Sequence, residues 1–168
     1  MNQRTINIAD VEATRRLGRR LGSALQAGDL VALIGPLGSG KTTLVKGIAA
    51  GAGVADSRQV NSPTFVIVNE YETGLSPAPR IYHIDAYRLR GGGDLESLGF
   101  DEMLSLGAVL IEWADRVQGV LPSSRLEISI EPVDENRRRF LCRAFGSATR
   151  LLDRLGPDER IVRPAVNG

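Results

Sequence analysis

The chain has 168 residues, one cysteine and a formal net charge of +1 at pH 7. The length favours a single domain around one core. The near-zero charge argues against a direct nucleic-acid ligand, and no apolar run approaches the roughly 18 residues of a membrane-spanning helix. Because the N-terminal residues lack the apolar core of a signal peptide, and one cysteine cannot form an internal disulfide, we expect a cytoplasmic protein.

The first 34 residues predict a strand, a helix and a second strand. Residues Arg4 to Ile8 alternate in polarity, as a half-buried strand does. Asp10 is a good N-cap, and an apolar stripe of helical period indicates a helix that continues to about Ala27. After a turn, the short apolar run Leu30 to Ile34 predicts the second strand.

The next segment, Gly35 to Thr42, reads GPLGSGKT and matches G-x-x-x-x-G-K-T, the phosphate-binding loop of P-loop nucleotide hydrolases. A strand leads into it and residues 43–50 leave it as a helix, which is the context that this motif requires. The glycines let the backbone direct N–H groups inward, and the helix start adds roughly half a unit of positive charge. Lys41 can reach the β- and γ-phosphates, and the Thr42 hydroxyl can ligate Mg²⁺. A simple glycine-rich turn would not explain why every fixed position is filled between a strand and a helix.

The rest of the chain predicts short strands and helices. Residues 65–71 and 80–85 are β-rich and are separated by a Gly- and Pro-containing turn, so we expect an antiparallel hairpin. The remaining elements are short helical pieces at 94–98 and 101–104, strands at 108–112, 126–131 and 138–145, and a short helix at 147–155. We therefore predict one P-loop ATPase domain over residues 1–155 and a polar tail over residues 156–168.

Two acidic residues close apolar strands, Asp85 and Glu112. Ligands of open α/β sheets gather at the carboxyl ends of strands, so both acids can face the phosphates, and either can anchor Mg²⁺. Taken alone, each could also be a surface carboxylate at a strand end. Thr64, in Ser62-Pro63-Thr64-Phe65, offers a hydroxyl that can sense the γ-phosphate as switch loops do, or it belongs to a simple turn before a strand.

Four motifs in order give the chain a family resemblance. They are Gly35 to Thr43, Ser62 to Phe65, His83 to Leu89, and Glu112-Trp113. In these motifs the chain resembles the TsaE (YjeE) family, the small P-loop ATPase of bacterial tRNA threonylcarbamoyladenosine synthesis. The resemblance covers roughly residues 5 to 150.

The resemblance implies an α/β fold of the P-loop NTPase type, with three layers and a mixed parallel and antiparallel central sheet flanked by helices. It implies that ATP or ADP binds with Mg²⁺ and that ATP is hydrolysed slowly, with stimulation by two partners, TsaB and TsaD. In this family TsaD transfers the threonylcarbamoyl group to adenosine 37 of tRNAs that read codons starting with A. The ATPase is implied to support turnover of that complex, and to meet tRNA only through it.

The resemblance also implies roles for individual residues. The implied catalytic residues are Lys41, Asp85, Glu112 and the switch-like Thr64. The implied Mg²⁺ ligands are Thr42 and Glu112. The residues implied to bind the nucleotide are Gly35, Gly38, Ser39, Gly40, Lys41, Thr42, Thr43, Val11 and Arg138. Of these, Val11 and Arg138 are assigned to the adenine side.

Three other functions remain open on the same loop. A nucleoside or small-molecule kinase could use Arg88 to Arg90 as a short lid, although the chain leaves little room for an acceptor domain. A GTPase would carry an Asn-Lys-x-Asp motif, and this sequence has none. A regulatory module could use the nucleotide only to change shape, and it would bind ATP tightly without hydrolysing it.

Overall fold

The computed structural model describes residues 2–62, 67–74 and 79–157. Its centre is a seven-stranded sheet in the order β1-β7-β6-β2-β5-β4-β3. The strands are Asn2–Ile8 (β1), Leu30–Ile34 (β2), Val68–Tyr71 (β3), Arg80–Asp85 (β4), Gly107–Glu112 (β5), Arg125–Pro132 (β6) and Arg138–Phe145 (β7). Strand β2 is parallel to both β5 and β6, and β4 is parallel to β5, whereas β1, β3 and β7 run antiparallel to their neighbours. The expected mixed sheet is confirmed.

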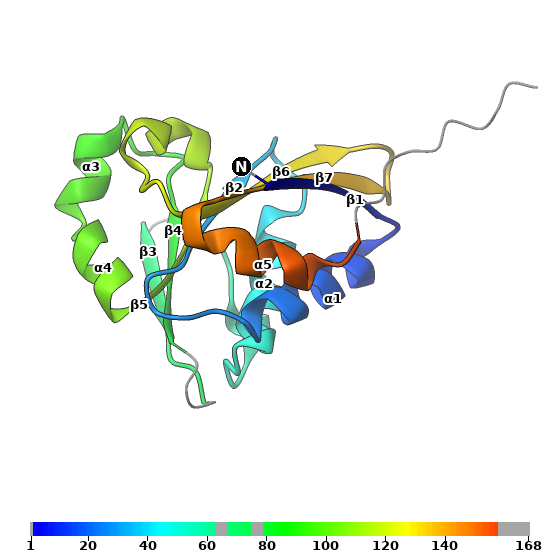
Figure 1. The fold of residues 1–168 in the computed structure, drawn as a ribbon, viewed down its shortest axis with the longest axis horizontal. Helices are drawn as coiled ribbons and strands as arrows, with labels where there is room; N and C mark the ends of the chain where they lie inside the picture. The colour runs from blue at the N-terminus through cyan, green and yellow to red at the C-terminus, as the bar shows by residue number, and fades with distance from the viewer. Residues whose placement is uncertain (1, 63–66, 75–78, 158–168) are drawn as a thin grey trace, which may run out of the picture.

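Helices cover both faces of this sheet (Figure 1). The helices are Val11–Gly22 (α1), Lys41–Gly51 (α2), Gly92–Ser97 (α3), Phe100–Leu106 (α4) and Thr149–Leu152 (α5). One buried cluster joins the sheet to α1, α2 and α5, and a second joins it to α3 and α4. The three-layer α/β fold expected from the sequence is therefore confirmed. Within residues 2–62, 67–74 and 79–157, no helix is long and apolar enough to cross a bilayer.

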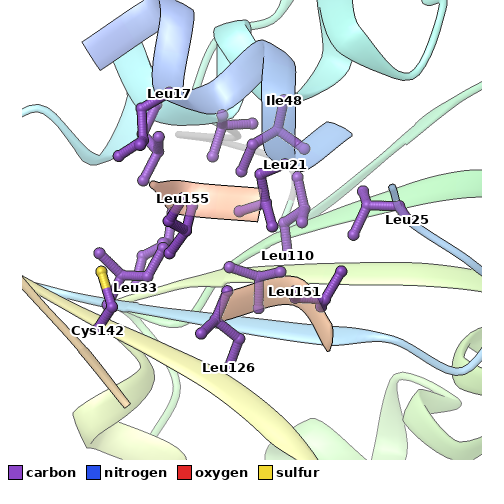
Figure 2. Close-up of a cluster of buried hydrophobic side chains, with 14 of the residues drawn as sticks. Leu17, Leu21, Leu25, Leu33, Ile48, Leu110, Leu126, Cys142, Leu151 and Leu155 are labelled. Carbon is purple, nitrogen blue, oxygen red and sulfur yellow. The ribbon is translucent and has the colours of Figure 1, made fainter. Parts of the chain in front are cut away.

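Side chains from three helices and the sheet meet in the larger cluster (Figure 2). Leu17 and Leu21 come from α1, Ile48 comes from α2, and Leu33 is the second-last residue of β2, the strand before the phosphate-binding loop. Cys142 is fully buried here, and burial raises the pKa of its thiol to about 12. It is a core residue of β7, and the cluster packs α2 against the sheet.

Helices α1 and α2 pack backbone to backbone. A Cβ atom on Gly22 would lie 1.9 Å from the carbonyl oxygen of Ile48, and one on Gly51 would lie 2.1 Å from that of Arg19. Since real Cβ contacts are never so short, only glycine fits at these crossing points. The helix that follows the phosphate-binding loop, α2, is therefore packed tightly against α1.

The predicted end of the first helix, at about Ala27, is wrong. Helix α1 stops at Gly22, and tight turns follow. The backbone bends there to bury Leu25 in the core, while Arg150 of α5 binds the carbonyl oxygen of Ala24 and the carboxylate of Asp29. Tertiary contacts therefore end this helix before its own sequence would.

Most other predicted elements are confirmed where the structure describes them, and the helix predicted at 147–155 is not. Strands β3 and β4 form the expected antiparallel hairpin, although residues 63–66 and 75–78 lie outside the described ranges. Helices α3 and α4 correspond to the two short helical pieces, and α2 contains the helix predicted over residues 43–50. The segment 146–155 is a succession of short turns around α5 rather than one helix.

Candidate nucleotide site

The glycines of the phosphate-binding loop are required by its shape. Gly38 and Gly40 have φ angles of +75° and +109°, a region that side chains with a Cβ rarely adopt. A Cβ on Gly35 would lie 2.7 Å from Ser39 Oγ and 2.8 Å from the carbonyl oxygen of Ile130 on β6. The loop is therefore wrapped between the end of β2 and the start of α2 in one well-defined conformation.

A pocket of about 550 Å³ opens above this loop. It lies at the carboxyl ends of β2, β4 and β5, where ligands of α/β sheets gather, and its size suits a small-molecule ligand. Its walls are formed by Leu37, Gly38, Ser39, Gly40, Lys41, Thr42, Thr43, Ser62, Ile67, Asp85, Tyr87, Arg88, Glu112 and Trp113. The fold thus gathers most of the site residues predicted from the sequence around one space.

Lys41 points back onto its own loop. Its Nζ donates to the carbonyl oxygens of Gly35 at 2.6 Å and Pro36 at 3.0 Å, and it lies 4.0 Å from the centre of the Trp113 ring. Burial lowers the pKa of Lys41, while the charges of Glu112 and Asp85 oppose that shift. An ammonium held in this way can turn toward a phosphate by exchanging carbonyl acceptors for phosphate oxygens.

Thr42 and Glu112 meet across the sheet edge. The Thr42 hydroxyl donates to the Glu112 carboxylate, with Oγ1 3.0 Å from Oε1 and 3.2 Å from Oε2. Its lone pairs stay available to a cation, and hydroxyl and carboxylate oxygens are the ligands that Mg²⁺ prefers. No cluster of three or more His, Cys, Asp or Glu residues able to hold a metal occurs among the described residues. The pair fits Mg²⁺ because this ion commonly takes only one or two protein ligands and draws the others from phosphates and water.

Asp85 lies beside Glu112, its partner in the β4–β5 register. Its Oδ2 accepts a hydrogen bond of 2.6 Å from the Ser62 hydroxyl, and its Oδ1 accepts one of 2.9 Å from the backbone N–H of Tyr87. The carboxylate lines the pocket and is half-buried. It can therefore accept a proton from, or orient, a water molecule at that wall.

Other predicted residues either do not line this pocket or are not among the residues that the structure describes. Val11 is the first residue of α1 and is 53% exposed. The Nε of Arg138 donates to the carbonyl oxygen of Ser39 at 3.1 Å, and its Nη1 donates to carbonyl oxygens of the β6–β7 turn. Arg138 thus braces the phosphate-binding loop, and an adenine contact of Val11 or Arg138 stays a prediction. Thr64 lies outside the described residues, so its role also stays a prediction.

Sequence reasoning missed several side chains of the site. Ser62 was noted only as part of the loop before Thr64. Tyr87 and Arg88 come two and three residues after Asp85, which was the signal that could have found them. His83 was noted only as the first residue of the motif His83 to Leu89. Its Nε2 lies 2.9 Å from Glu112 Oε1.

A strand–loop–helix that wraps a phosphate-sized turn, with two acids on neighbouring parallel strands, defines the P-loop class of nucleotide-binding α/β proteins. Within that class the chain belongs to the TsaE family. A family model described as "Threonylcarbamoyl adenosine biosynthesis protein TsaE" matches residues 8–140.

Individual relatives agree with this assignment. The chain is 38% identical over 150 residues to the tRNA threonylcarbamoyladenosine biosynthesis protein TsaE of Bacillus subtilis, with 89% of each chain covered. It is 46% identical over 118 residues to the TsaE protein of Streptomyces coelicolor, covering 70% of this chain and 78% of that one. Among solved structures, Bacillus subtilis YdiB matches with a TM-score of 0.76 and 31% identity, over 92% of this chain and 94% of that one. The predicted family is confirmed.

Proposed function

We propose that this protein is a Mg²⁺-dependent ATPase that acts in the cytoplasm in the synthesis of threonylcarbamoyladenosine in tRNA. In this proposal it binds and slowly hydrolyses ATP, and so supports turnover of a TsaB–TsaD pair that modifies adenosine 37 of tRNAs reading codons that start with A. Membership of the TsaE family and the names of its relatives support the pathway. The site geometry supports the chemistry.

The observation that carries the ATPase proposal is the meeting of Lys41, Thr42, Glu112 and Asp85 around one pocket. Lys41 and the loop N–H groups, from Gly35 to Thr43, would hold the β- and γ-phosphates. Thr42 and Glu112 would hold the Mg²⁺ ion, which, when bound, neutralises charge on the phosphates. Asp85 would orient the attacking water and accept its proton. Thr64 would sense the γ-phosphate as switch residues do, and Val11 and Arg138 would flank the adenine.

Steady-state ATP hydrolysis tests this proposal. The protein is assayed alone and with a purified TsaB–TsaD pair, with the Lys41→Ala variant as the control that removes the cation aimed at the phosphates. We expect a low rate that rises with the pair and is lost in the control. Undetectable hydrolysis in both conditions, alongside tight ATP binding, would contradict the ATPase and leave a regulatory module.

The same assay tests the proposed partnership with the TsaB–TsaD pair separately. A rate that depends on Lys41 but ignores the TsaB–TsaD pair would keep the nucleotide chemistry and contradict the partnership. Transfer of labelled phosphate from ATP to a nucleoside or sugar would instead identify a kinase.

A further inference from the structure

His83 is the single histidine of the chain, and it lies in the middle of β4 with its side chain fully buried. Residues two apart on a strand share a face, so His83 lies on the same side of the sheet as Asp85. Strand β5 runs alongside, with Leu110 opposite His83 and Glu112 opposite Asp85. The imidazole therefore reaches diagonally toward the carboxylate that the proposed function assigns to Mg²⁺.

The direction of the hydrogen bond follows from the chemistry of the two groups. Glu112, as a carboxylate, can only accept, so the hydrogen must be on His83 Nε2, which is 2.9 Å from Oε1. The Thr42 hydroxyl donates to the same oxygen at 3.0 Å. Glu112 is only 2% exposed, so solvent cannot readily replace a donor that is lost. The carboxylate is thus held between a helix residue and a strand residue.

The second ring nitrogen, Nδ1, indicates the role of the His83 imidazole. His83 Nδ1 is buried and has no hydrogen-bond partner among the described residues, and the nearby Tyr71 ring lies 6.2 Å away, centroid to centroid. A histidine that only filled the core would be expected to have its polar atoms satisfied. The hydrogen bond to Glu112 is the one that the ring makes in the described part of the molecule.

The geometry points to His83 as the positioning residue of the metal-binding carboxylate. Its Nε2–H holds Glu112 in the orientation in which the carboxylate also receives Thr42, and so prepares both Mg²⁺ ligands before the nucleotide arrives. This inference rests on the proposed function of Glu112. Hydrogen-bond partners of metal ligands typically change metal affinity or activity by about 10–100-fold when they are removed.

A matched pair of variants separates positioning from core filling. The amide nitrogen of His83→Gln is three bonds from Cβ, as Nε2 is, whereas that of His83→Asn takes the place of Nδ1. Calorimetry measures ADP affinity with Mg²⁺ and with EDTA. We expect His83→Asn to bind ADP about tenfold more weakly than the wild-type protein in Mg²⁺, and equally well in EDTA. His83→Gln should stay close to the wild-type protein.

The other outcomes would overturn either the positioning role of His83 or the metal role of Glu112. Equal losses in the two variants, or an equal loss in Mg²⁺ and in EDTA, would overturn the positioning role while leaving the proposed function intact. A wild-type protein whose ADP affinity ignores Mg²⁺ would overturn the metal role of Glu112, and the His83 role with it. In a Glu112→Gln background, His83→Asn should cause no further loss of Mg²⁺-dependent affinity.

A second measurement needs no variant at His83, so poor folding of His83→Asn cannot block the test. Because the chain has one histidine, ¹⁵N NMR of the imidazole gives one pair of signals. We expect the hydrogen on Nε2, and a larger shift of that signal when ADP binds with Mg²⁺ than when it binds with EDTA. A hydrogen on Nδ1, or the same shift in both conditions, would contradict the inference.

Discussion

Glu112 and Asp85 are neighbours at one edge of the sheet, yet the molecule holds them in different ways. Glu112 is buried and receives hydrogen bonds from Thr42 on α2 and His83 on β4, which are residues of regular secondary structure. Asp85 is half-buried and receives its bonds from Ser62 and the backbone of Tyr87, which lie in loops. The two acids look alike in the sequence, yet Glu112 lies in a rigid environment and Asp85 lies in a more adaptable one.

This difference matches the two roles in the proposed function. A metal ligand is most effective when its orientation is fixed in advance by packing and by further hydrogen bonds. A residue that places water next to a changing phosphate must follow that phosphate, and loops are the parts of a fold that can move. Variants at the two acids should therefore have separable effects on hydrolysis and on Mg²⁺ binding.

The largest expected effect is that of Asp85→Ala on hydrolysis. We expect kcat to fall by about 10²–10⁴-fold, as is typical when a positioned acid–base group is lost, while ADP affinity in Mg²⁺ changes little. Steady-state kinetics and calorimetry on the same preparation measure the two quantities. Asp101→Ala, an exposed acid on α4, is the control. Unchanged turnover in Asp85→Ala would move Asp85 to a structural role.

Glu112→Gln should have the opposite profile. The amide keeps the shape of the side chain but loses the charge that attracts Mg²⁺, so we expect about a 10–100-fold loss of ADP affinity in Mg²⁺ and little loss in EDTA. Glu127→Gln is a matched control, because Glu127 is also a buried strand residue and pairs with Arg125 away from the pocket. An equal loss in both conditions for Glu112→Gln would argue against a metal role.

Ser62→Ala should weaken the role of Asp85. It removes the 2.6 Å hydrogen bond to Oδ2, and a bond to a charged group is worth about 1.5 kcal/mol at the low end of its range, or roughly a tenfold loss of kcat. The Mg²⁺ dependence of ADP affinity should not change, since the hydrogen bond that is removed goes to Asp85 and not to a proposed Mg²⁺ ligand. Ser57→Ala, on the preceding 3₁₀ turn, controls for loss of a nearby hydroxyl. A shift in Mg²⁺ dependence would mean that the two acids act as one unit.

The sequence predicted those parts of the site that depend on local order. The glycines, Lys41 and Thr42 follow from one motif, and Asp85 and Glu112 follow from their places at strand ends. These features could be found because a strand, a tight loop and a helix N-terminus together have few possible geometries.

The remaining contacts depend on which strands are neighbours. That His83 reaches Glu112 requires β4 to lie beside β5, and that Arg138 reaches Ser39, 99 residues away in sequence, requires the β6–β7 hairpin to lie beside β2. Strand order is set by packing of the whole core and has no local signal. For the same reason the end of α1 was misplaced, because Arg150 and the burial of Leu25 decide it.

The smallest expected effect compares how strongly the two acids act on Lys41. Burial lowers the pKa of Lys41, and Glu112 counteracts that shift more than Asp85 does. We therefore expect Glu112→Gln to lower the pKa of Lys41 further, and Asp85→Asn to lower it by less. The chain has two lysines, Lys41 and Lys46, so NMR titration of the lysine side chains, with Lys46→Arg to assign the signals, gives the order directly.

The same titration predicts how stability responds to pH. In the unfolded chain Lys41 should titrate near its ordinary pKa of 10.5, and in the folded protein it should titrate lower. Between these two values the unfolded state binds more protons, so the contribution of Lys41 to the free energy of unfolding should rise with pH in that window. Lys41→Met should remove the rise, and Lys46→Met should keep it. A folded Lys41 that titrates at or above 10.5 would contradict the burial of its ammonium, and with it the conclusion that the buried acid dominates the charge at this site.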